Sequence, residues 1–173
     1  PDALDQLGIE RRELKLFDDD GLRLPLDGIR TRVLNTLREL NPDIVHTNSL
    51  STSRICGGIA DQLSMPVVGH VRDIMNVSGQ VIRDLNQLIR VIAVSHATRD
   101  NLLLQGLSPQ NCNVVYNGVN TTQFTPSQNT NAQSHEFFTV GGVGQIGMRK
   151  GWEILIDAFA KLVKHAPNCQ LEI

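Results

Sequence analysis

The stretch RVIAVSHATRDNLLLQG, Arg90 to Gly106, joins a strand pattern to a helix pattern and indicates the fold class. Its opening run, RVIAVS, is short, apolar and rich in β-branched residues, as expected of a parallel strand that is covered on both faces. The remainder begins at Ser95, a residue type that caps helices, and stops at Gly106, a residue type that ends them. We therefore predict one strand followed directly by one helix.

The same alternation recurs along the whole chain. Further strand-like runs are DIVH near Ile44, MPVVGHV from Met65, NVVYN from Asn113, EFFTVG from Glu136 and CQLEI at the end. Apolar residues recur at helical spacing within four intervals, 29–40, 55–63, 82–89 and 152–166, and Asp27 is placed to cap the first of these helices. Regular alternation of strands and helices predicts an α/β fold of the doubly wound type, with parallel sheets.

One polar segment interrupts this rhythm. Residues 120–136 are rich in Ser, Thr, Asn and Gln and contain Pro126, a composition typical of a linker. We predict an N-terminal domain over residues 1–124, a linker over 125–135 and the start of a second domain over 136–173.

Composition excludes several classes of protein. A net charge of -2 shows no basic excess, so nucleic acid is not expected as a partner. Cys56, Cys112 and Cys169 are widely spaced, which suggests neither a disulfide framework nor a zinc site and fits a reducing cytosol. No apolar run approaches the roughly 20 residues of a membrane span. A first residue Pro1 and an unfinished strand pattern at Ile173 predict that the sequence is a fragment of a longer protein.

The glycine-rich stretch GGVGQIGMRKGWEIL, Gly141 to Leu155, is the strongest candidate for a phosphate site. Glycines between a strand and a helix let a ligand approach the backbone, and a helix N-terminus attracts anions. Arg149 and Lys150 add positive charge at the same place. The alternative is a structural turn whose basic residues are merely solvated.

The stretch also contains the pattern G-x-G-x-x-G, which some dinucleotide-binding domains carry. In those domains the helix begins within the glycine pattern, and an acidic residue follows about 20 positions later. Here the amphipathic period begins only at Trp152, and Glu172 lies 25 residues past Gly147. The match to a dinucleotide-binding turn is therefore weak.

Five motifs together point to a family. They are NPDIVHTNS (41–49), VVGHVRD (67–73), VIAVSHATRDNL (91–102), VVYNGVNTTQF (114–124) and GQIGMRKGWEILIDAFAKL (144–162). In order and spacing the chain resembles the family 4 retaining glycosyltransferases. The resemblance implies the GT-B architecture, in which two Rossmann-like domains face each other across a cleft. The chain would cover the second half of the N-terminal, acceptor-side domain and the start of the C-terminal, donor-binding domain, so that both domains are incomplete.

The resemblance assigns roles on the donor side of the reaction. His70 resembles the family histidine that reaches the donor sugar, and we expect it to be catalytic, the alternative being a hydrogen-bonded core histidine. Lys150 matches the lysine that pairs with the donor diphosphate, with Gly144 and Arg149 beside it. The family usually has an arginine five residues before that lysine, where this chain has Gln145. An amide supplies no charge to a departing diphosphate, so this difference predicts either weakened activity or a relocated contact.

The acceptor side is less sharply defined. His46 and Asn48 end the strand pattern DIVH and are candidates to line the cleft, or else cap the next helix. Arg72 and Asp73 follow His70 and either contact acceptor or form a mutual surface ion pair. We interpret Ser95 as a helix cap with a secondary role at the cleft.

The resemblance implies transfer of a sugar from a nucleoside diphosphate sugar to an acceptor hydroxyl with retention of configuration. It implies no metal and no cofactor, a glycan or lipid-linked acceptor, and a cytoplasmic protein that associates peripherally with the inner face of the membrane. Two alternatives remain: a non-catalytic nucleotide-sugar binding module, favoured by Gln145, and an NAD-dependent dehydrogenase. We expect the fragment alone to be inactive and poorly stable.

Overall fold

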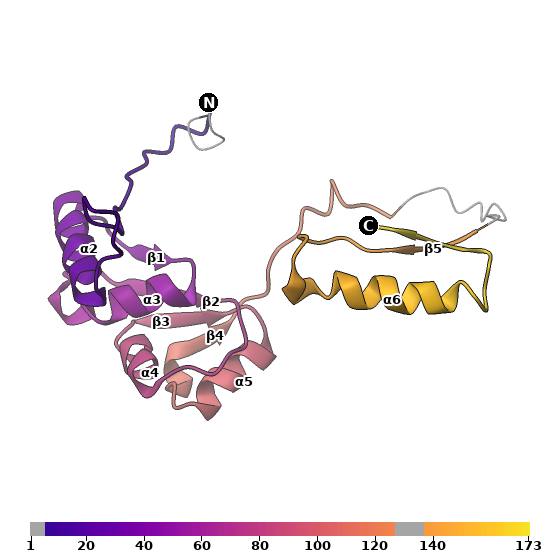
Figure 1. Ribbon diagram of the computed structural model, residues 1–173. Coiled ribbons are helices and arrows are strands. Elements are labelled where there is room, and N and C mark those ends of the chain that lie inside the picture. The colour runs from indigo at the N-terminus through magenta and orange to yellow at the C-terminus, as the bar shows by residue number, and fades with distance from the viewer. Residues whose placement is uncertain (1–5, 127–136) are drawn as a thin grey trace. The chain divides into compact units, whose positions relative to one another are not determined.

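The computed structural model describes residues 6–126 and 137–173 and separates into two units (Figure 1). Unit 1 comprises residues 1–119 and unit 2 comprises residues 120–173. The predicted linker, 125–135, lies almost wholly outside the described residues, so its bounds stay a prediction.

Unit 1 is built on a four-stranded parallel sheet whose strands follow the chain order, β1-β2-β3-β4. Its elements in chain order are α2 (Leu26–Leu40), β1 (Val45–Thr47), α3 (Leu50–Gly57), η1 (Ala60–Gln62), β2 (Val67–Val71), α4 (Gly79–Asn86), β3 (Arg90–Ala93), α5 (His96–Leu104), η2 (Pro109–Asn111) and β4 (Cys112–Val114). The expected α/β class with parallel strands is confirmed.

The helices of unit 1 cover one face of this sheet. The buried sheet residues Val67, Val71, Val91 and Ala93 share one face, and they form a core with helix residues that include Leu85 and Leu102. On the other face, His46 and Arg90 are exposed, and Val68, His70 and Ile92 are only partly covered. The sheet therefore has one packed face and one face that the described residues leave accessible.

Unit 2 contains two parallel strands, β5 (Phe138–Gly141) and β6 (Cys169–Glu172), with η3 (Met148–Lys150) and α6 (Trp152–Leu162) between them. The partly buried residues of α6 repeat at helical spacing, Trp152, Leu155 and Phe159. No described residue of this unit is fully buried. Unit 2 therefore has only a thin apolar layer between its helix and its sheet.

Two details of the helices differ from the sequence expectations. Asp27 does not cap α2, because the residue before the helix is Pro25 and no side chain caps that end. The side chain of Asp27 lies instead in the first turn, 3.7 Å from Arg30. The apolar stripe of α6 is also narrower than predicted, since Ile156 and Leu162 are 49% and 43% exposed. Ser95 does cap α5, as predicted, by accepting a hydrogen bond from the Thr98 N–H.

A buried ion pair ties three helices of unit 1 together. Arg30 of α2 donates to the Asp84 carboxylate of α4 at 2.7 Å and to the carbonyl of Arg54 in α3 at 3.2 Å. Gln80 donates to the other carboxylate oxygen of Asp84 at 2.8 Å. Asp84 is almost fully buried, so its charge depends on these donors for compensation.

We predict that Asp84→Ala lowers the free energy of unfolding by about 3–5 kcal/mol, because the poorly solvated Arg30 loses its buried carboxylate partner and keeps only the exposed Asp27 at 3.7 Å. Urea denaturation measures the change. Glu39→Ala is the matched control, since it breaks an exposed pair with Arg12 and should cost far less. Equal losses from the two substitutions would contradict the argument.

Helices α3 and α4 also meet at a glycine. A Cβ atom at Gly57 would lie 2.1 Å from the backbone carbonyl oxygen of Asp84. We predict that Gly57→Ala destabilises unit 1 by about 3 kcal/mol, the upper end of the usual cost of overpacking. Gly79→Ala is the control, because the nearest atom to a Cβ there is the Arg83 side chain at 3.5 Å. Thermal melting of both variants tests this, and a Gly57→Ala variant as stable as Gly79→Ala would refute it.

Candidate functional site

The sheet of unit 1 gathers several candidate residues at one edge. Since all four strands are parallel, their carboxyl ends lie at the same edge, which is where open α/β sheets bind ligands. Asn48 follows β1, Arg72 and Asp73 follow β2, and Ser95 follows β3 by two residues. The structure thus places four of the residues predicted from the sequence at this edge.

Arg72 is held by Asn48. The guanidinium donates to the Asn48 side-chain oxygen at 2.5 Å, which connects the ends of β2 and β1. Of the two roles considered for Arg72 and Asp73, the mutual ion pair does not occur among the described ion pairs. The amide of Asn48 fixes the direction of Arg72 without neutralising it, so a positive charge remains available at the strand ends.

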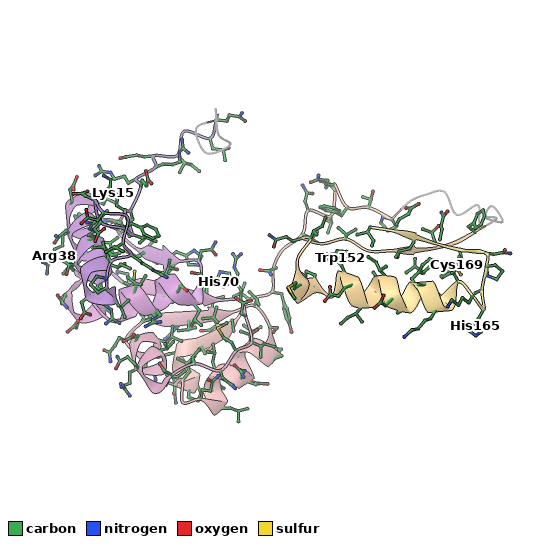
Figure 2. The ribbon with its side chains drawn as sticks, in the orientation of Figure 1. Lys15, Arg38, His70, Trp152, His165 and Cys169 are labelled. Carbon is green, nitrogen blue, oxygen red and sulfur yellow. The ribbon has the colours of Figure 1, made fainter. Side chains whose placement is uncertain are left out.

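His70 lies within β2, one residue before its end (Figure 2). Its ring stacks on that of His46 of β1. The ring centroids are 5.6 Å apart with an interplanar angle of 22°. Both ring nitrogens of His70 are buried and have no hydrogen-bond partner among the described residues. Burial lowers the pKa of His70 from its ordinary value of 6.5, and the charges of Arg72 and His46 lower it further. The lowered pKa favours the neutral imidazole, in which one ring nitrogen carries a proton and the other is an acceptor.

Polar contacts fix the backbone around these residues. The buried hydroxyls of Thr47 and Ser53 lie 2.8 Å apart, and Ser53 also donates to the Ser49 carbonyl at 2.7 Å. Ser49 caps α3 by accepting from the Thr52 N–H. The end of β1 is therefore joined firmly to the start of α3, which positions Asn48 between them.

The loop after Arg72 is anchored by Gln105, a residue that the sequence patterns do not single out. Its side-chain oxygen accepts from the Val77 N–H at 2.7 Å, and its amide nitrogen donates to the Met75 carbonyl at 3.0 Å. A lone glutamine at the end of a helix carries no signal in the sequence, because its two partners in the loop, Val77 and Met75, are 28 and 30 residues away in the chain.

In unit 2 the candidate donor residues lie between β5 and α6. The N-terminus of α6 has no side-chain cap, so its first backbone N–H groups are open to an anion. The exposed Lys150 directly precedes Gly151, whose φ of 70° is a left-handed conformation that favours glycine. Gly144 and Gln145 are exposed in the preceding loop, whereas the side chain of Arg149 lies outside the described part of the structure.

Neither a metal cluster nor a membrane span occurs in the described part of the chain. Within residues 6–126 and 137–173, no group of three or more His, Cys, Asp or Glu side chains is arranged to hold a metal ion. In the same ranges, no helix combines the length and apolar character needed to cross a bilayer. The absence of a metal requirement in the reaction stays a prediction.

The chain belongs to Glycosyltransferase Family 4, because the model of that family matches residues 2–123, which is more than half of the sequence. The family resemblance drawn from the five motifs is thereby confirmed. Over 105 residues the chain is 26% identical to a subunit of phosphatidylinositol N-acetylglucosaminyltransferase from Arabidopsis thaliana, an alignment that covers 60% of this chain and 22% of that protein.

Solved structures of HepE from Anabaena share the fold. The crystal structure with UDP-glucose matches with a TM-score of 0.67 at 23% identity, covering 97% of this chain and 48% of that one. The structure with UDP matches with a TM-score of 0.67 at 23% identity over 91% and 46% of the two chains. The chain thus spans about half the length of HepE and a much smaller part of the plant protein, and the expected GT-B fold class is confirmed.

The His70 environment gives a measurable prediction. Arg72→Gln should raise the pKa of His70 toward 6.5, since one neighbouring positive charge is removed while burial still lowers it. NMR titration of the imidazole protons measures this. Arg90→Gln is the control, because Arg90 is not among the causes of the shift, and an equal rise in both variants would overturn the assignment.

The same shift has a consequence for stability. Because the pKa is lower in the folded state than in the unfolded state, the unfolded chain binds more protons. The contribution of His70 to the free energy of unfolding is therefore fully present above pH 6.5 and is lost as the pH falls through the folded-state pKa.

Proposed function

We propose that the complete protein transfers a sugar from a nucleoside diphosphate sugar to an acceptor hydroxyl, with retention of configuration at the anomeric carbon. The observation that carries the proposal is the family match over residues 2–123, joined to an uncapped helix start beside Lys150. The names of the relatives support it: HepE has been crystallised with UDP-glucose, and the plant protein is named as part of an N-acetylglucosaminyltransferase.

In the proposed reaction, the bond between the anomeric carbon and the diphosphate oxygen breaks, and a bond from the acceptor oxygen to the same carbon forms. The acceptor proton passes to the departing diphosphate, so a pair of carboxylates of the kind used by glycosidases is not needed. Lys150 and the N–H groups at the start of α6 stabilise the charge that develops on the diphosphate. No cofactor takes part.

On the acceptor-side unit, the neutral His70 contacts the donor sugar as a hydrogen-bond donor or acceptor. His46, Asn48, Arg72 and Asp73 line the acceptor part of the site, and Ser95 acts mainly through its cap of α5. The name of the plant relative contains a membrane phospholipid, which supports a lipid-linked acceptor and association with a membrane surface. A location on the cytoplasmic side is part of the proposal.

A non-catalytic nucleotide-sugar binding module is the second candidate, and one observation favours it. The neutral Gln145 stands where the family usually has an arginine, so the described loop carries less positive charge than an active member would. The dehydrogenase alternative is weakened, because α6 begins at Trp152 rather than near Gly144.

We predict that Lys150→Ala lowers kcat/KM for the donor by about 10²–10³, as removal of one electrostatic donor commonly does. Lys161→Ala is the control, since Lys161 is an exposed lysine in the last turn of the same helix. Transfer assays on the complete protein, with a panel of nucleotide sugars, measure both. Turnover that is insensitive to Lys150→Ala would refute the assigned role.

Gln145→Arg separates the two candidate functions. If the protein is an enzyme weakened by the missing charge, Gln145→Arg should raise its kcat, because the new arginine restores that positive charge. A protein that binds UDP but shows no turnover, with or without Gln145→Arg, would instead be a binding module.

A further inference from the structure

We infer that Trp152 is a positioning residue, which holds the loop of residues 142–147 in the shape that the donor diphosphate requires. We infer also that residue 142 is glycine because the Trp152 ring occupies the space that a side chain would need. The inference rests on the proposed function for the identity of the ligand.

The first observation is a hydrogen bond that crosses the loop. The indole N–H of Trp152 donates to the backbone carbonyl of Gln145 at 2.9 Å, which joins the first residue of α6 to the middle of the loop. Trp152 lies at the N-terminal end of α6 (Figure 2) and is partly buried. The backbone that presents the Gln145 side chain is therefore fixed by the helix.

The second observation concerns space. A Cβ atom at Gly142 would lie 2.6 Å from Cζ3 and 3.1 Å from Cη2 of the Trp152 ring. At Gly144 it would lie 3.3 Å from Cζ2, which is also tight. At Gly147 a Cβ would meet nothing within 4 Å. Two of the three glycines in the G-x-G-x-x-G pattern thus lie against the tryptophan.

Backbone conformation does not account for these glycines. Gly142, Gly144 and Gly147 are not among the glycines with positive φ, whereas Gly151 is. A residue with a side chain could therefore adopt the backbone conformation of Gly142. The physical reason for glycine at this position is that the Trp152 ring occupies the space of the side chain.

The loop has two further anchors. The Gly142 N–H donates to the Glu172 carbonyl at 2.8 Å, which pins the start of the loop to β6. The Lys150 N–H donates to the Gly147 carbonyl at 3.0 Å, which pins its end to η3. The bond from Trp152 holds the middle, so its loss releases the segment between two fixed ends.

The inference is tested by a double-mutant cycle in the complete protein, with UDP as the probe and isothermal titration calorimetry as the measurement. Gly142→Ala and Trp152→Leu should each raise the Kd for UDP by about tenfold, since a small displacement of a positioned group is costly. Trp152→Leu frees the space near residue 142, so Gly142→Ala should have almost no further effect in that background. Gly141→Ala is the matched control, because a Cβ there meets nothing within 4 Å.

A second arm does not depend on a ligand. Trp152→Phe keeps an aromatic ring but lacks the N–H group, so amide hydrogen exchange at residues 143–147 should become faster, while exchange in β5 stays unchanged. In Trp152→Phe, the KM for the nucleotide sugar donor should rise by a larger factor than kcat falls, because Trp152 positions the loop and does not touch the reacting atoms.

Independent effects of Gly142→Ala and Trp152→Leu on the Kd, or unchanged exchange in Trp152→Phe, would overturn the inference. If the wild-type protein binds neither UDP nor any other nucleoside diphosphate, the proposed function fails, and the exchange measurement alone still decides whether Trp152 holds the loop.

Discussion

Parallel pairing of the strands is the constraint on which the remaining structure depends. Each parallel connection needs a crossover, and in unit 1 helices α3, α4 and α5 supply these crossovers and pack against one face of the sheet. All carboxyl ends then lie at one edge. Residues far apart in sequence, such as Asn48 and Arg72, meet there because of this geometry and form a hydrogen bond.

Polar side chains support this framework at places where the helices approach one another closely. Gly57 allows α3 to approach the backbone of α4, and the Arg30–Asp84 pair joins both helices to α2. A buried pair of this kind contributes little net stability compared with apolar packing, but the loss of one partner leaves a buried charge. It therefore favours one arrangement of the three helices over others.

The two units differ in how they present charge to a ligand. In unit 1 burial and the charges of Arg72 and His46 lower the pKa of His70, and Arg72 is oriented by an amide that leaves its charge intact. In unit 2 the charge comes from Lys150 and the start of α6, with the neutral Gln145 in the loop between. Gly142 and Gly144 of that loop are explained by the ring of Trp152 better than by a dinucleotide.

The α/β class, the Ser95 cap and the family follow from the amino-acid sequence alone, because apolar periodicity, cap chemistry and ordered motifs are local properties. Tertiary structure was needed for the stacking of His70 on His46, the bond between Arg72 and Asn48, the anchoring role of Gln105 and the contact of Trp152 with Gly142. Each of these contacts depends on which residues the sheet register and the helix packing bring together. The spacing of two residues along the sequence does not give their separation in space.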